Sequence, residues 1–136
     1  MEARRIRVFF YGLFMDPDLL RDRGLRPVNA RPACVPGMRL RIGERAALEL
    51  DPDGVVYGIL VELTHGDIER LYAEPSVSPY RPEAVLAEPD EGEPVAALCY
   101  NLPSAPTDQP NLEYVRKLRE LAARLALPAG YVSSIG

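Results

Sequence analysis

The chain has 136 residues, of which 47% are hydrophobic, and its 16 basic and 20 acidic residues leave a formal net charge of −4. This composition excludes an intrinsically disordered chain. It also lacks the excess of basic residues that is typical of nucleic-acid-binding domains. The length predicts a single domain over residues 1–136, with one core and room for one sizeable pocket.

The N-terminal segment predicts neither export nor membrane insertion. Basic residues precede the apolar residues 8–11, but this run ends at Gly12 and is too short for the apolar region of a signal peptide. No run approaches the roughly 20 apolar residues of a membrane span. We therefore expect a cytoplasmic protein with no membrane partner.

The chain has few of the histidine and cysteine residues that usually bind metal ions. His65 is the one histidine, and no CxxC or HExxH spacing is present. Cys34 and Cys99 are far apart in a chain without an export signal, which favours two buried, reduced thiols over a disulfide. The sequence therefore predicts no metal site.

The chain opens with the pattern of a strand, a glycine loop and a short helix. β-Branched and aromatic residues over 6–11 favour a strand that stops at Gly12. Asp16 followed by Pro17 is typical of a helix start, with Asp16 as the N-cap, and Gly24 indicates the end of that helix.

The middle of the chain predicts two strands and a second short helix. Apolar residues alternate with arginines over 38–42, which predicts a half-buried strand with the arginines in solvent. A turn over 51–54 then leads into a strong strand over 55–63. Thr64 and Asp67 resemble a capping box, so a helix should begin here and end before Pro75.

The last part predicts two strands and one long helix. Residues 80–88 and 94–102 are strand candidates joined by an acidic turn, and the spacing fits a meander or barrel of antiparallel strands. Apolar residues recur at helical intervals from Leu112 to Leu125, so an amphipathic helix should pack on the sheet. A short tail with Tyr131 and Ile135 should follow.

Two segments place polar groups in apolar surroundings. The strand that enters Gly12 runs toward a helix N-terminus, so the N–H groups of Gly12, Leu13 and Phe14 could bind an anion or an oxyanion. The simpler alternative is a turn that needs a glycine for its backbone angles. Further on, Leu71, Tyr72 and Val77 would partly desolvate Glu74, which suits a general acid or base; the alternative is an ordinary surface glutamate.

These segments resemble motifs of the gamma-glutamylcyclotransferase family, including its AIG2-like and BtrG-like members. Residues 10–15 are similar to that family's YGSLM or YGSNL substrate loop, and residues 58–71 are similar to the passage that precedes its catalytic glutamate. That glutamate corresponds to Glu74. The similarity continues through residues 80–82, 97–100, 103–104, Tyr114 and 127–131, so it spans nearly the whole chain.

The resemblance implies an α+β fold: a small mixed, mostly antiparallel β-barrel flanked by short helices and one longer C-terminal helix. It also implies a cofactor-independent enzyme that cyclises a small gamma-glutamyl compound to 5-oxoproline and releases an amine or amino acid. Glu74 would be the catalytic acid/base. The substrate-binding residues would be Tyr11, Gly12, Leu13, Phe14, Tyr80, Tyr100 and Tyr114.

The chain departs from the family pattern at both motifs. Leu13 and Phe14 stand where the family often has serine and asparagine or leucine, and Glu74 follows Leu71 by three residues rather than four, with Pro75 in place of glycine. A non-catalytic small-molecule-binding domain on the same fold is therefore the main alternative. A protein-interaction module on the last helix is less favoured, because that helix's charged outer residues are typical of a solvated face.

The remaining candidates have structural interpretations of their own. The four tyrosines could line a pocket, or each could be a core residue with one satisfied hydroxyl. Arg81 could clamp a carboxylate, but an arginine at a strand edge is usually in solvent, and we expect His65 on the surface.

Overall fold

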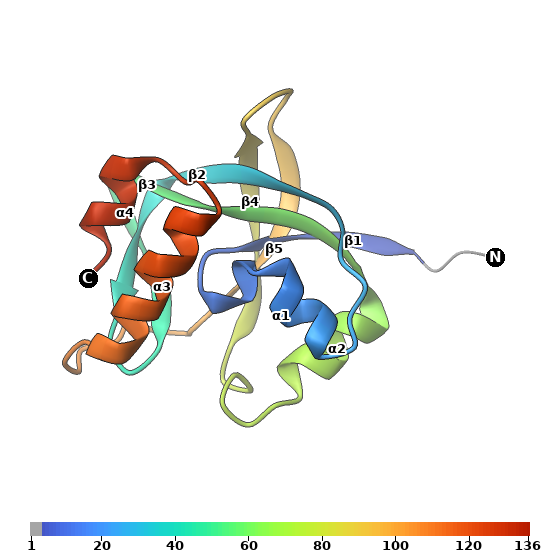
Figure 1. Cartoon of the computed structure of the whole chain (residues 1–136), viewed down its shortest axis with the longest axis horizontal. Helices are drawn as coiled ribbons and strands as arrows, with labels where there is room; N and C mark the ends of the chain where they lie inside the picture. Colours follow the sequence, from blue (N-terminus) through green and yellow to red (C-terminus); the bar gives the residue numbers. More distant parts are fainter. Residues whose placement is uncertain (1–3) are drawn as a thin grey trace.

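The computed structural model describes residues 4–136, so the first three residues of the N-terminal segment considered above lie outside it. The elements follow the chain as shown in Figure 1. They are β1 (Arg5–Phe10), a 3-10 turn η1 (Leu13–Met15), α1 (Pro17–Asp22), β2 (Val28–Ile42), β3 (Ala46–Thr64), α2 (His65–Tyr72), β4 (Arg81–Pro89), β5 (Val95–Asn101), α3 (Leu112–Arg124) and α4 (Ala129–Ser134).

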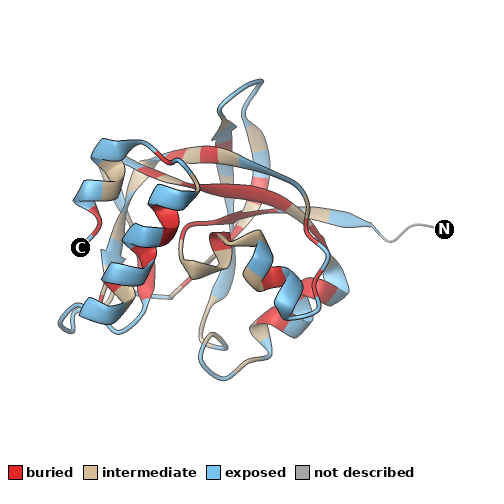
Figure 2. Ribbon diagram, viewed as in Figure 1, coloured by how far each residue is buried: buried red, intermediate tan, exposed pale blue. Residues whose placement is uncertain are grey.

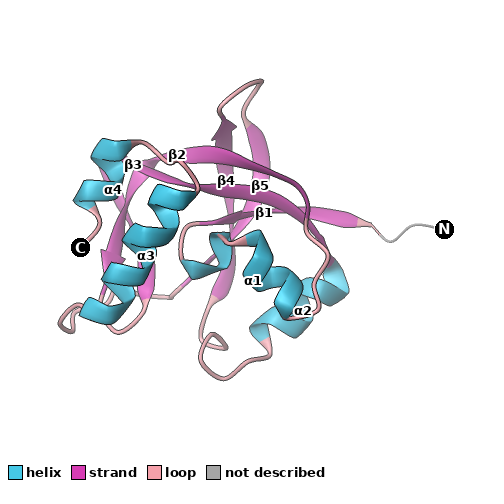
Figure 3. Cartoon of the chain, viewed as in Figure 1, coloured by secondary structure: helices cyan, strands magenta, loops and turns pink. Residues whose placement is uncertain are grey.

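The strands close into a barrel with the order β1-β3-β2-β4-β5. Neighbouring strands are antiparallel except β1 and β5, which pair in parallel at Val8 and Leu98 and so close the barrel. Helices flank the barrel, with α3 the longest of those described (Figure 3). The predicted α+β fold with a small mixed, mostly antiparallel barrel is therefore confirmed.

The longest strands, β2 and β3, form a ribbon that corrects one prediction. Residues 51–54 do not separate two strands; they lie inside β3 as a bulge opposite Gly37, which has a positive φ of 85°. Asp53 N–H donates to Asp51 Oδ1 at 3.0 Å, so the local bend expected from the sequence does form. The strand continues because β2 supplies pairing partners on both sides of the bulge, which a local pattern does not show.

The predicted helix starts are confirmed, and their caps explain them. Asp16 accepts a hydrogen bond from the Asp18 N–H at 3.0 Å, and Thr64 and Asp67 form a reciprocal capping box although an aspartate replaces the usual Glu or Gln. The predicted C-terminal tail is wrong, because residues 129–134 form α4. Ile135 is buried in the core behind it, and such tertiary docking stabilises short helices that sequence propensity does not predict.

Two hydrophobic clusters make up the core (Figure 2). One packs the helices against the barrel and includes Val8, Leu63 and Leu118; the other fills the barrel and includes Phe9 and Val56. β1 contributes to both, since its last three residues are buried whichever face they point to. This fixes the end of β1, and with it the loop that begins at Gly12.

The cysteines differ in burial. Cys99 is fully buried in the barrel and its burial raises the pKa of the thiol to about 12, whereas Cys34 is only half-buried; both are free thiols. None of the helices in residues 4–136 has the length and apolar character needed to cross a membrane.

Candidate functional site

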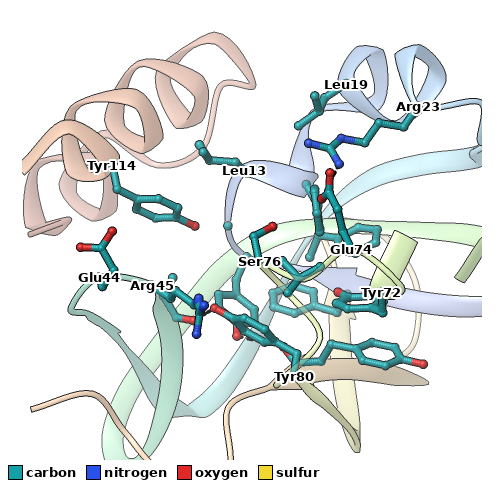
Figure 4. Close-up of a pocket in the computed structure, with 18 residues that line it drawn as sticks. Leu13, Leu19, Arg23, Glu44, Arg45, Tyr72, Glu74, Ser76, Tyr80 and Tyr114 are labelled. Carbon is teal, nitrogen blue, oxygen red and sulfur yellow. Dashed lines mark hydrogen bonds and ion pairs between the residues drawn. The ribbon is translucent and has the colours of Figure 1, made fainter. Parts of the chain in front are cut away.

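A pocket of about 410 Å³ opens where the loop after β1, the first turn of α3, the β2–β3 turn and the loop after α2 meet (Figure 4). Its walls come from six separate stretches of sequence, so only folding assembles it. All of the site residues proposed from the sequence line this pocket: Tyr11, Gly12, Leu13, Phe14, Glu74, Tyr80, Tyr100 and Tyr114.

The loop after β1 presents backbone donors to the pocket. Met15 N–H donates to Gly12 O at 3.0 Å and Asp16 N–H to Leu13 O at 3.3 Å, which starts the 3-10 turn. Gly12 is the N-cap of that turn and Leu13 and Phe14 are its first two residues, and within residues 4–136 the N–H groups of these three residues have no backbone acceptor. They are therefore available to oxygen atoms of a side chain or a ligand.

Tyr114 already lies against this loop. Asn111 caps α3 by accepting from the Tyr114 N–H at 3.2 Å, which sets Tyr114 in the first turn. Burial raises the pKa of the Tyr114 phenol to about 12, and the nearby Leu13 backbone partly offsets this rise. A Cβ atom on Gly12 would lie 2.5 Å from this hydroxyl, so the close approach requires glycine here.

Glu74 stands on the loop after α2, on the opposite wall from Tyr114 (Figure 4). The Val77 N–H donates to Glu74 O at 3.1 Å and turns the chain back toward the pocket. The carboxylate is 40% exposed and forms an ion pair, with Arg23 Nη1 2.5 Å from Glu74 Oε2. Glu74 is thus a partly exposed pocket carboxylate that pairs with Arg23 at one edge of the cavity.

The tyrosines divide between the two interpretations left open by the sequence. Tyr11 is a core residue with a satisfied hydroxyl, since it is 6% exposed and donates to Tyr100 O at 2.9 Å, although its edge reaches the pocket. Tyr80 donates to Ala46 O, and Tyr100 stacks on Tyr72 with ring centroids 4.0 Å apart. Burial raises the pKa of each of these phenols, so all remain neutral donors or acceptors at physiological pH.

The structure adds pocket residues beyond the predicted site residues, although the sequence already placed Tyr72 beside Glu74. Arg23 comes from the C-terminal cap of α1, Glu44 and Arg45 from the β2–β3 turn, and Tyr72 from the last turn of α2. Tyr72 follows an apolar helix face and carried a signal for burial, but the other three stand on exposed elements and reach the pocket only through tertiary packing.

Two other candidates lie outside the pocket, as expected. Arg81 is exposed and donates to Ser78 O at 2.7 Å and Tyr80 O at 3.0 Å, and the His65 side chain is 77% exposed. In the part of the chain that the structure describes, no three His, Cys, Asp or Glu side chains are grouped closely enough to hold a metal ion.

Comparison with known proteins gives one family match and several structural ones. Residues 8–119 match the family model described as gamma-glutamyl cyclotransferase, AIG2-like, whereas no curated protein matches the sequence. A solved structure named gamma-glutamyl cyclotransferase is similar with a TM-score of 0.80 at 16% identity, over 97% of this chain and 86% of the other.

Two further solved structures have the same fold. An uncharacterized protein from Homo sapiens has a TM-score of 0.79 at 18% identity, over 96% of this chain and 86% of that one. YkqA from Bacillus subtilis has a TM-score of 0.76 at 22% identity, and the match covers 97% of this chain but 53% of YkqA. At these identities the structural likeness shows the fold alone.

Proposed function

Because this chain belongs to the gamma-glutamyl cyclotransferase, AIG2-like family, we propose that it cyclises a small gamma-glutamyl compound to 5-oxoproline and releases an amine or amino acid. The observation that carries the proposal is the pairing of groups in one pocket: the Glu74 carboxylate on one wall and the N–H groups of Gly12, Leu13 and Phe14 on another. The volume of about 410 Å³ suits a small-molecule ligand.

In the proposed reaction the substrate supplies its own nucleophile. Glu74 accepts a proton from the α-amino group, and the amine nitrogen attacks the γ-carbonyl carbon. A new carbon–nitrogen bond closes the five-membered ring, the bond to the leaving nitrogen breaks, and Glu74 returns the proton to that nitrogen. No water, cofactor or external nucleophile enters the balance, and ring closure benefits from the proximity of the two reacting atoms.

The backbone donors have a matching task. The α-carboxylate or the γ-carbonyl oxygen of the substrate would lie against the N–H groups of residues 12–14. A donor aimed at a developing oxyanion lowers the activation free energy by about 3 to 4 kcal/mol. The neutral phenols of Tyr80 and Tyr114 line the same pocket and can orient the remaining polar atoms of the substrate.

The test is the Glu74→Gln variant, assayed by release of 5-oxoproline from gamma-glutamyl amino acids. Glutamine keeps the shape but accepts no proton, so we expect kcat to fall by about 10²–10⁴-fold. The matched control is Glu69→Gln on α2, whose side chain is 74% exposed and outside the pocket, and which should retain full activity. Equal 5-oxoproline release by the Glu74→Gln variant and the wild type would overturn the proposal.

A non-catalytic binding domain is the second candidate, and one observation favours it. Leu13, Phe14 and Val77 make much of the wall apolar, and one carboxylate oxygen of Glu74 is occupied by Arg23. Calorimetry separates the two: binding of a gamma-glutamyl compound by wild-type protein without any 5-oxoproline release would support the binding domain.

A further inference from the structure

Arg23 and Arg45 both line the pocket, and two partners fix the position of Arg23. Its Nη1 lies 2.5 Å from Glu74 Oε2, and its guanidinium carbon lies 5.4 Å from the centre of the Phe14 ring. Figure 4 shows the Arg23 and Glu74 side chains pointing toward each other at one edge of the pocket. Phe14 in η1 and Arg23 at the end of α1 are close in sequence, whereas Glu74 is on the loop after α2, so the contact joins the N-terminal segment to a distant loop.

Phe14 is itself held in place. Its ring packs edge to face on Phe10, at 6.0 Å and 80°, and on Tyr72, at 6.1 Å and 86°. Tyr72 in turn stacks on Tyr100 of β5. A cation within about 6 Å of an aromatic centroid is attracted by the ring quadrupole, so Phe14 offers Arg23 a fixed face that is anchored to the barrel.

This arrangement leaves the two oxygens of Glu74 unequal. Arg23 Nη1 lies against Oε2, whereas Oε1 accepts no hydrogen bond within residues 4–136. The loop that carries Glu74 has no regular structure, and a free glutamate side chain samples many rotamers. Partly exposed ion pairs of this kind contribute little to stability, so the geometry of the pair matters more than its contribution to folding.

We propose that Arg23, supported by Phe14, is a positioning residue: it holds Glu74 by Oε2 so that Oε1 is the oxygen that transfers the proton. This inference rests on the proposed cyclotransferase function. It also gives the aromatic residue at position 14, where the family often has asparagine or leucine, a physical task, because an aliphatic side chain has no face to hold a guanidinium.

The experiment measures kcat and KM for 5-oxoproline release from γ-glutamyl-L-alanine. A catalytic group displaced by about 1 Å can lose about 10²-fold in rate, so we expect Arg23→Met to lower kcat by about 10- to 100-fold while KM changes little. Arg23→Lys should restore part of the rate because it keeps the charge, and Phe14→Leu should lower kcat by a smaller factor. Arg21→Met is the matched control: Arg21 is on the same helix and pairs with Asp18 at 3.0 Å, outside the pocket.

A second readout does not depend on turnover. Crystal structures of the wild type and of Arg23→Met should show one Glu74 side-chain conformer in the first and several in the second, with circular dichroism to verify folding. An unchanged kcat in Arg23→Met, or a single unchanged Glu74 conformer, would overturn the inference. A raised KM at constant kcat would do so too, because it would make Arg23 a substrate ligand. If wild-type protein releases no 5-oxoproline, the proposed function fails, and the conformers of Glu74 still decide whether Arg23 positions it.

Discussion

The pocket and a second hollow on this protein have similar volumes, about 410 and 490 Å³, and differently built walls. The second hollow lies between the β2–β3 ribbon, the loop before α3, and α4 with the chain end that follows it. Its walls hold Arg39 and Arg41, which pair with Glu49 of β3, and the exposed Asp108. The pocket instead brings together backbone donors, a carboxylate and buried phenols.

The comparison teaches that volume alone does not mark a functional site. In the second hollow, Arg39 and Arg41 form ion pairs with Glu49 on the surface of the β2–β3 ribbon. In the pocket, groups from separate segments converge on one space and include an oxygen, Glu74 Oε1, that accepts no hydrogen bond in the described part of the chain. Convergence of a few polar groups in an apolar setting is what small-molecule sites require.

The same substitution at Gly12 of the pocket and at Gly130, next to Tyr131 of the second hollow, should separate the two regions most strongly. Gly12→Ala places a Cβ 2.5 Å from the Tyr114 hydroxyl, so the loop or Tyr114 must move by about 1 Å, and kcat/KM for 5-oxoproline release should fall by about 10²-fold. Gly130→Ala in α4 meets no atom within 4 Å and should leave kcat/KM unchanged.

A second-site change tests the reason for that loss. Tyr114→Phe removes the atom that the new Cβ would strike, so the Gly12→Ala, Tyr114→Phe double variant should be more active than Gly12→Ala alone. If Tyr114→Phe deepens the defect instead, the close contact is not its cause.

The stability of the protein at high pH should depend on the pocket phenols. Burial raises the pKa of Tyr114 to about 12 from 10.0, so the native state holds a proton that the unfolded state has lost. This contribution is fully present below pH 10 and is lost as the pH rises toward 12. Urea unfolding at pH 9 to 12 should show a decline that is shallower in Tyr114→Phe, by about 1 kcal/mol per pH unit; identical slopes would contradict this.

The smallest effect is expected at the second hollow. The Tyr131 hydroxyl is buried with no hydrogen-bond partner within residues 4–136, and burial raises its pKa to about 12. Tyr131→Phe removes this unpaired group, so the free energy of unfolding at pH 7 should stay constant or rise by up to about 1 kcal/mol. A clear loss of stability would mean that the hydroxyl has a partner, such as the nearby backbone of Tyr57.

The helix starts and the opening strand were predictable because their signals are local. Asp16 and Thr64 cap helices through hydrogen bonds that span only a few residues, and the run of large apolar residues that ends at Gly12 is buried in two clusters. The bulge at 51–54 and helix α4 were not predictable in this way. Each depends on a partner distant in sequence: β2 for the bulge and the core around Ile135 for the helix.

The candidate site also has features that the sequence predicts and features that depend on residues distant in sequence. The sequence by itself determined which residue types are present and, through its resemblance to a family, predicted that Glu74 and the loop at Gly12 contribute to one site. Only the tertiary structure showed that Tyr11 is a core residue, that the Tyr114 hydroxyl lies close to Gly12, and that Arg23 forms an ion pair with Glu74. The reason is physical: caps and strand patterns follow from neighbouring residues, whereas a pocket forms only when distant segments are packed together.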